Sequence, residues 1–166
     1  MAAETGEQRF YEVLKGVELD LRYLDFCRKR RAERGRSQHA SMTLPEITAC
    51  VERIPLAFRY VKSESFFRYR EKISGATLFF QLSMRSDLVT PMIYLETEEY
   101  AYGMPFAMVS LRLIKTREGY QAPQPSELAL PFSGGDDLFS ALEFVTSLFM
   151  EARDALKTAG SWAGEA

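Results

Sequence analysis

The segment from Leu56 to Ile114 contains the stretch FFRYREKISGATLFFQL at residues 66–82. Apolar side chains alternate with polar ones on both sides of Ser74-Gly75, a pair of residues typical of a tight turn. In the first half, Arg68 and Arg70 fall on the face opposite the large apolar side chains. The stretch therefore predicts an antiparallel hairpin with one buried face and one basic, solvent-facing side.

Other segments extend this hairpin into a sheet. Residues 92–95 are apolar on both faces, which indicates a central strand, and residues 84–90 are predicted to form a loop before it. We expect a strand at Phe106–Ile114 because Ser110 and Arg112 alternate with apolar residues, and the alternative is a short helix beginning at Pro105. Residues 128–132 are expected to form a final edge strand.

Helical periodicity flanks the sheet region. Apolar residues recur at steps of three and four over residues 5–34, 43–53 and 136–159, which predicts three helices. A threonine stands three residues before Gln or Glu at the start of the first two segments, and this is the spacing of a capping box.

These elements predict one α+β domain that covers residues 1–166. An N-terminal helix pair should precede an antiparallel sheet region of about five strands, between residues 56 and 132, and a C-terminal helix should pack on one sheet face. The opposite face is expected to stay at least partly exposed. No repeat, low-complexity tract or linker suggests a second domain.

Charge and composition exclude few classes of function. The formal net charge is −2, but residues 1–75 carry 15 Lys/Arg against 11 Asp/Glu, whereas residues 76–166 carry 6 against 12. Opposite potentials at two ends of one domain favour an oriented encounter with a charged partner. No apolar run approaches the roughly 18 residues of a membrane span, so we expect a cytoplasmic chain with no membrane partner.

Nothing in the sequence predicts a catalytic residue, a metal site or a cofactor. The two cysteines, Cys27 and Cys50, lack the spacing of zinc ligands, and His39 is the single histidine. Glu96 and Glu98 point the same way if they lie on a strand, so an enzyme with an unrecognised carboxylate site remains the weakest of three hypotheses.

The favoured hypothesis rests on an acidic segment rich in tyrosine. It contains the predicted partner-binding residues Glu96, Glu98, Glu99, Tyr100 and Tyr102. Tyrosine is enriched at protein interfaces, and carboxylates steer a basic partner. We therefore predict a non-catalytic protein-binding module, such as an inhibitor or a bacterial immunity-type protein that occludes a partner protein. The alternative interpretation is a polar hairpin tip.

Two other partners compete with this hypothesis. Arginines at the end of the first helix and in the hairpin could bind anions such as nucleic acid or a phospholigand, namely Arg28, Arg30, Arg31, Arg34, Arg68 and Arg70. Basic residues at a helix C-terminus also match the helix dipole without any ligand. A homodimer through the uncovered sheet face would equally explain the high aromatic content.

Overall fold

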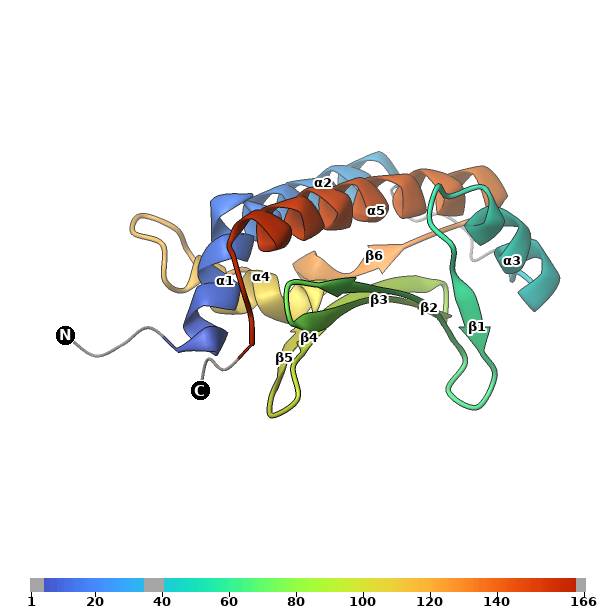
Figure 1. Ribbon diagram of the computed structural model, residues 1–166. Helices are drawn as coiled ribbons and strands as arrows, with labels where there is room; N and C mark the ends of the chain where they lie inside the picture. The colour runs from blue at the N-terminus through green and yellow to red at the C-terminus, as the bar shows by residue number, and fades with distance from the viewer. Residues whose placement is uncertain (1–4, 35–40, 164–166) are drawn as a thin grey trace.

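The computed structural model describes residues 5–34 and 41–163. His39 therefore lies outside the described residues. The chain forms an α+β domain, as the sequence predicts, with its helices on one side of an antiparallel sheet (Figure 1). The helices are α1 (Gly6–Gly16), α2 (Leu19–Arg34), α3 (Leu44–Glu52), α4 (Phe106–Ile114), the short 3-10 helix η1 (Pro125–Leu128) and α5 (Gly135–Thr158).

Five strands lie side by side in chain order, and a sixth pairs with the beginning of the fourth. The strands are β1 (Arg59–Val61), β2 (Phe66–Ile73), β3 (Ala76–Arg85), β4 (Leu88–Glu96), β5 (Ala101–Pro105) and β6 (Leu130–Pro131). All pairs are antiparallel. The predicted hairpin is confirmed, since β2 and β3 pair up to Ile73 and Ala76 around the Ser74-Gly75 turn.

The predicted loop at residues 84–90 is wrong. Strand β3 continues to Arg85, and β4 already begins at Leu88. The two residues between them, Ser86 and Asp87, have φ values of 52° and 58°. Two consecutive left-handed residues match the twist of a tight hairpin, but Ser-Asp lacks the glycine or asparagine that usually marks such a turn.

The predicted strand at Phe106–Ile114 is also wrong, because this segment is helix α4. Its buried residues follow helical steps of three and one: Phe106, Val109, Ser110, Leu113 and Ile114. Nine residues with this pattern satisfy the periodicities of both a strand and a helix, so alternation alone could not separate them. Pro105 ends β5, where it pairs with Met92, and it precedes the first helical turn.

The expected helix over residues 5–34 is broken into α1 and α2. Glu18 adopts a left-handed conformation with φ of 55°, and its N–H donates to the carbonyl oxygen of Lys15. This conformation commonly ends a helix, although glycine usually occupies it. Beyond the break, the buried carboxylate of Asp20 pairs with Arg117, which follows α4. A contact between residues so distant in sequence explains why local periodicity missed the break.

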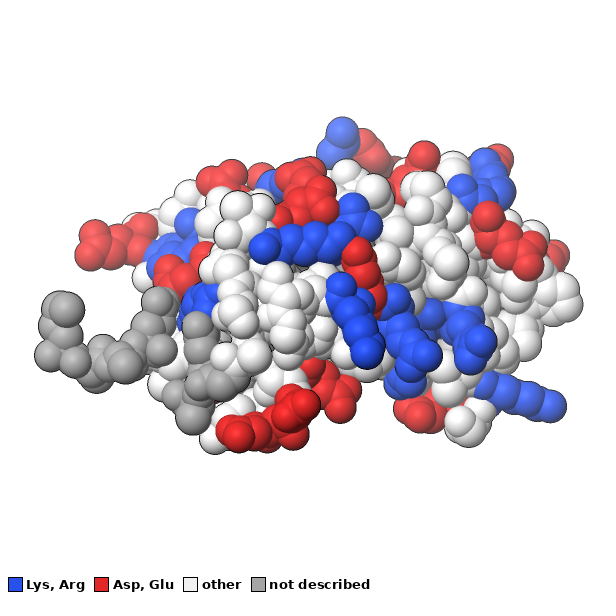
Figure 2. Space-filling view, viewed as in Figure 1, with Lys and Arg blue, Asp and Glu red and all other residues white. Residues whose placement is uncertain are grey.

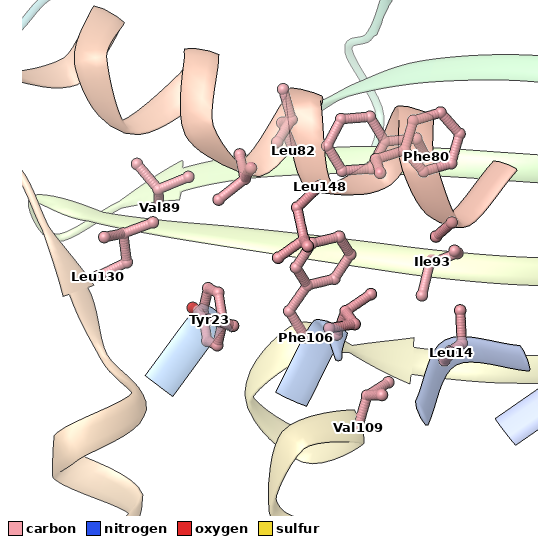
Figure 3. Close-up of a cluster of buried hydrophobic side chains, with 14 of the residues drawn as sticks. Leu14, Tyr23, Phe80, Leu82, Val89, Ile93, Phe106, Val109, Leu130 and Leu148 are labelled. Carbon is pink, nitrogen blue, oxygen red and sulfur yellow. The ribbon is translucent and has the colours of Figure 1, made fainter. Parts of the chain in front are cut away.

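The main core lies between the sheet and the helices. Phe80 of β3 stacks on Phe149 of α5 with ring centroids 4.3 Å apart, and its centroid is 5.9 Å from that of Phe106. Figure 3 shows side chains from the sheet pointing toward side chains from the helices around Phe106. Because the core takes one face of each strand, the other face of the sheet is left without a helix.

The C-terminal segment closes one end of this core. Trp162 is 1% exposed, and its backbone N–H donates to the carbonyl oxygen of Ser74 at 2.7 Å. The indole Nε1–H donates to the carbonyl oxygen of Leu156 at 3.1 Å, and the Arg9 guanidinium lies 4.2 Å from the ring. The tail thus holds α1, α5 and the β2–β3 turn together.

The two cysteines are unpaired and buried. Burial raises the pKa of the Cys27 thiol from 9.0 to about 11, although the neighbouring arginines partly oppose this shift. The unfolded chain therefore loses this proton at a lower pH than the native chain does. The stability that the neutral thiol contributes is complete below pH 9 and is lost as the pH rises to about 11.

We expect wild type to lose about 2 to 3 kcal/mol more unfolding free energy than Cys27→Ala between pH about 8 and about 11. Urea unfolding of both proteins at the two pH values measures this difference. Comparing the two pH dependences removes the loss of packing that alanine causes at every pH. Parallel declines of the two proteins would contradict the raised pKa.

Candidate functional site

The sheet face opposite the helices carries the candidate site. Alternation places Leu78, Phe80 and Leu82 in the core, so the intervening side chains point away from the helices. We call this surface the open face; it consists of Arg59, Phe66, Arg68, Arg70, Lys72, Thr77, Phe79, Gln81, Met92, Tyr94 and Glu96. Apart from the buried Phe66, these side chains are half-buried or exposed.

Strand register arranges the open face in rows across the sheet. One row runs from Arg70 through Phe79 to Tyr94, because Phe79 pairs with both of the others. The neighbouring row runs from Lys72 through Thr77 to Glu96. Each row thus has a cation on β2, and a half-exposed aromatic or a carboxylate on β4.

The basic strand β2 lies beside a further cation on β1. Arg59 pairs with Arg68, whose guanidinium lies 4.9 Å from the ring centroid of Phe66 and 5.5 Å from that of Phe79. Contact with two ring faces holds Arg68 flat on the sheet. Arg70 is exposed, so its charge is available to a partner.

An acidic corner closes the other side of the open face. We call residues 96–100 the acidic turn; it consists of the last residue of β4 and the four residues that join β4 to β5. The N–H of Thr97 donates to the carbonyl oxygen of Tyr100 at 2.7 Å, and its hydroxyl accepts from the N–H groups of Glu99 and Tyr100 at 3.3 and 3.0 Å. These bonds order the backbone that presents the exposed Glu98 and Glu99.

Four of the five predicted partner-binding residues lie together in the acidic turn, but Tyr102 does not share their exposure. Tyr102 pairs with the buried Leu95, and its ring lies 6.3 Å from that of Phe10 on the helix side of the sheet. The ring of Tyr100 is 43% exposed and stacks on it at 6.2 Å. Tyr102 therefore packs against Tyr100, one of the predicted partner-binding residues.

A shallow groove separates the two charged regions. Its volume is about 610 Å³, and its lining includes Arg70 and Lys72 on one side, Glu96 and Glu98 on the other, and Phe79 between them. Figure 2 shows Lys and Arg side chains over the β1–β2 part of the sheet and a separate group of acids at the β4–β5 turn. The groove thus has cations along one side and carboxylates along the other.

The helical arginines of the predicted anion site have partners within the chain. Arg28 forms an ion pair of 2.9 Å with Glu127, and Arg34 lies 3.2 Å from Asp137, which also binds the buried Arg30. Arg31 donates to the carbonyl oxygen of Ser126. These contacts fasten α2 to η1 and to the start of α5. Of the predicted anion-binding residues, Arg68 and Arg70 alone lie on the open face.

Sequence reasoning did not assign two members of the site, Arg59 and Tyr94. Their places depend on the pairing of β1 with β2 and of β3 with β4. Once the register is known, alternation from Arg68 and Phe79 finds both. Without the register, neither Arg59 nor Tyr94 could be assigned to this face from its residue type.

The chain matched no protein-family model, no curated protein and no solved structure. Among the described residues, no helix is long and apolar enough to cross a membrane. Residues 5–34 and 41–163 contain no group of three or more His, Cys, Asp or Glu arranged to hold a metal ion.

Proposed function

We propose that the chain is a non-catalytic protein-binding module that contacts its partner with the open face and the acidic turn. The observation that supports this proposal is the uncovered sheet face, where Phe79 and Tyr94 lie half-exposed between a basic strand and an ordered acidic turn. In monomeric proteins, an exposed patch of this kind marks an interaction site.

The composition of the open face suits a protein more than a small substrate. Aromatic residues and arginine are the residue types enriched at protein interfaces and at their energetic centres. The groove is shallow and wide, whereas small-molecule pockets bury most of their ligand. The charges suit a protein surface with basic side chains opposite Glu98 and Glu99 and acidic side chains opposite Arg70.

An inhibitor or immunity-type role follows from the same geometry. A sheet face can cover a partner's active surface without a conformational change. Its backbone is fixed because each central strand is hydrogen-bonded to the strands on both sides. The ordered acidic turn would then steer a basic partner protein onto the face. In this proposal, the chain acts by occlusion.

Charge reversal of the acidic turn tests this function. We expect the triple variant Glu96→Lys, Glu98→Lys, Glu99→Lys to capture its protein partner at least about tenfold less than wild type does. Quantitative mass spectrometry after affinity purification from the native lysate measures this loss. The reversed charges lie on the surface, so melting temperature should change little.

A matched control reverses three exposed acids on the helices, with Glu33→Lys, Glu52→Lys and Glu143→Lys. It has the same net charge as the test variant and should retain the partner. Equal capture by wild type and both variants would overturn the assignment of the acidic turn.

A second candidate function is binding of single-stranded nucleic acid. Arg68 and Arg70 lie beside the ring of Phe79, with Arg59 on the next strand to one side and Tyr94 on the next strand to the other. Such a platform can neutralise phosphates while bases stack. The acidic turn at the edge of the same face opposes this function, because its carboxylates repel phosphate. Captured nucleic acid that is released as salt rises would favour it over a protein partner.

A further inference from the structure

We infer that the open face fits a second copy of this chain, packed face to face about a twofold axis parallel to β3. This inference rests on the proposed function, since it takes the open face as the protein-binding surface. In a purified sample, the partner available to this surface is a second copy of the chain. A different protein partner would then compete with the second copy for the same residues.

The charge pattern of the open face is complementary to itself. Lys72 on β2 and Glu96 on β4 lie in one row, one strand away from β3 on opposite sides. A twofold axis along β3 places β2 of each copy over β4 of the other. Lys72 of one copy then faces Glu96 of the second copy, and the symmetry makes this contact twice.

The next row adds apolar contact at the centre of the same arrangement. Under this axis, Arg70 of each copy faces the ring of Tyr94 of the other, and the two Phe79 rings meet on the axis. A guanidinium over an aromatic face is a favourable contact. The half-exposed ring of Phe79 would become buried, so the apolar centre of the face gains a partner.

Charge also excludes the other face-to-face dimer. A twofold axis perpendicular to the strands, still within the interface, would place β2 over β2 and β4 over β4. With this axis through the row of Lys72 and Glu96, Lys72 would meet Lys72 of the second copy, and Glu96 would meet Glu96. Repulsion at both sides disfavours that arrangement, so the pattern of charges selects the axis along β3.

The size of the open face predicts a weak dimer. Five strands about 4.8 Å apart and about seven residues long give a face of roughly 20 Å by 23 Å, or about 450 Å² per copy. Two copies reach about 900 Å², near the roughly 1,000 Å² of the smallest specific interfaces. We therefore expect a dissociation constant on the order of micromolar that rises with salt.

Single charge reversals give the decisive experiment, with sedimentation velocity of the purified full chain as the measurement. Lys72→Glu and Glu96→Lys should each weaken dimerisation at least about tenfold, because each places like charges together at two symmetric contacts. Both residues are exposed, so both variants should fold. An equimolar mixture of the two variants should recover dimers, because every contact in the mixed pair again joins a cation to an anion.

Two control variants change the same charges on the helices. Lys29→Glu and Glu143→Lys, at exposed positions of α2 and α5, should dimerise as wild type does. A mixture of the test variants that stays monomeric would overturn the inference. Dimers that neither reversal weakens would also overturn it, since they would use another surface.

The inference and the proposed function can fail separately. If wild type is monomeric when pure, and capture from lysate still requires the acidic turn, the dimer is wrong and the binding module stands. If wild type is monomeric and capture does not depend on the acidic turn, both are wrong. Dimers that follow the charge-reversal pattern would support both.

Discussion

Replacing Arg117 by alanine is expected to lower the free energy of unfolding by about 3 to 5 kcal/mol. The guanidinium holds the fully buried carboxylate of Asp20 with bonds of 2.6 and 2.9 Å, and it also donates to the carbonyl oxygen of Lys15 at 3.0 Å. Removal of the cation leaves a buried charge without its counterion. Because the contact joins the segment after α4 to both α1 and α2, the N-terminal helices should loosen with it.

Urea denaturation followed by circular dichroism measures this loss. The control is Arg112→Ala, whose ion pair with Glu7 is about half-exposed on both sides and should contribute no more than about 1 kcal/mol. The single variant Asp20→Ala and the double variant Asp20→Ala, Arg117→Ala complete a cycle that should show strong coupling between the two residues. Similar losses for Arg117→Ala and Arg112→Ala would contradict the role of the buried pair.

Trp162→Ala is the second change with a large expected effect, a loss of about 3 to 5 kcal/mol. The indole is buried among α1, α5 and the β2–β3 turn, and alanine would leave a cavity there. Part of the loss comes from the carbonyl oxygen of Leu156, which would lose the indole donor.

Tyr120→Ala provides the matched control, because this aromatic side chain is 53% exposed and should cost less than about 1 kcal/mol. Thermal and urea unfolding by circular dichroism suit both variants, since Trp162 is the single tryptophan and its fluorescence disappears with the substitution. A loss below about 1 kcal/mol for Trp162→Ala would show that the tail does not fasten the core.

Local pattern sufficed where neighbouring residues decide the structure. The β2–β3 hairpin was predicted because alternation and the Ser74-Gly75 turn agree, and residues 43–53 and 136–159 were predicted as helices that correspond to α3 and α5. Of the edge strand predicted at residues 128–132, only Leu130–Pro131 forms a strand, β6, whereas Leu128 belongs to η1. In the hairpin and in these two helices, the sequence fits only one periodicity, that of a strand or that of a helix.

Prediction failed where distant residues or ambiguous spacing decide. Phe106–Ile114 satisfies two periodicities, and burial under α2 and against β4 selects the helix. Residues on both sides of the break at Glu18 contact Arg117, about one hundred residues later in the chain. Ser86-Asp87 forms a tight turn although it contains neither the glycine nor the asparagine that usually predicts one.

The candidate site could be predicted only where its residues are neighbours in the sequence. Consecutive residues formed the acidic turn, so sequence reasoning could find Glu98, Glu99 and Tyr100 together. It could not separate Tyr102, which turns toward Phe10 once the pairing with β4 is set. Nor could it show that Arg30 would form an ion pair with Asp137 at the start of α5.

We propose the open face as the protein-binding surface of this chain. Site-specific photo-crosslinking tests it most directly, with a benzophenone amino acid in place of Tyr94 at the centre of the face. The control position is Met108, which is 51% exposed on α4. We expect position 94 to give a protein adduct, with a second copy or another protein, and position 108 to give none. Adducts from position 108 alone would contradict it.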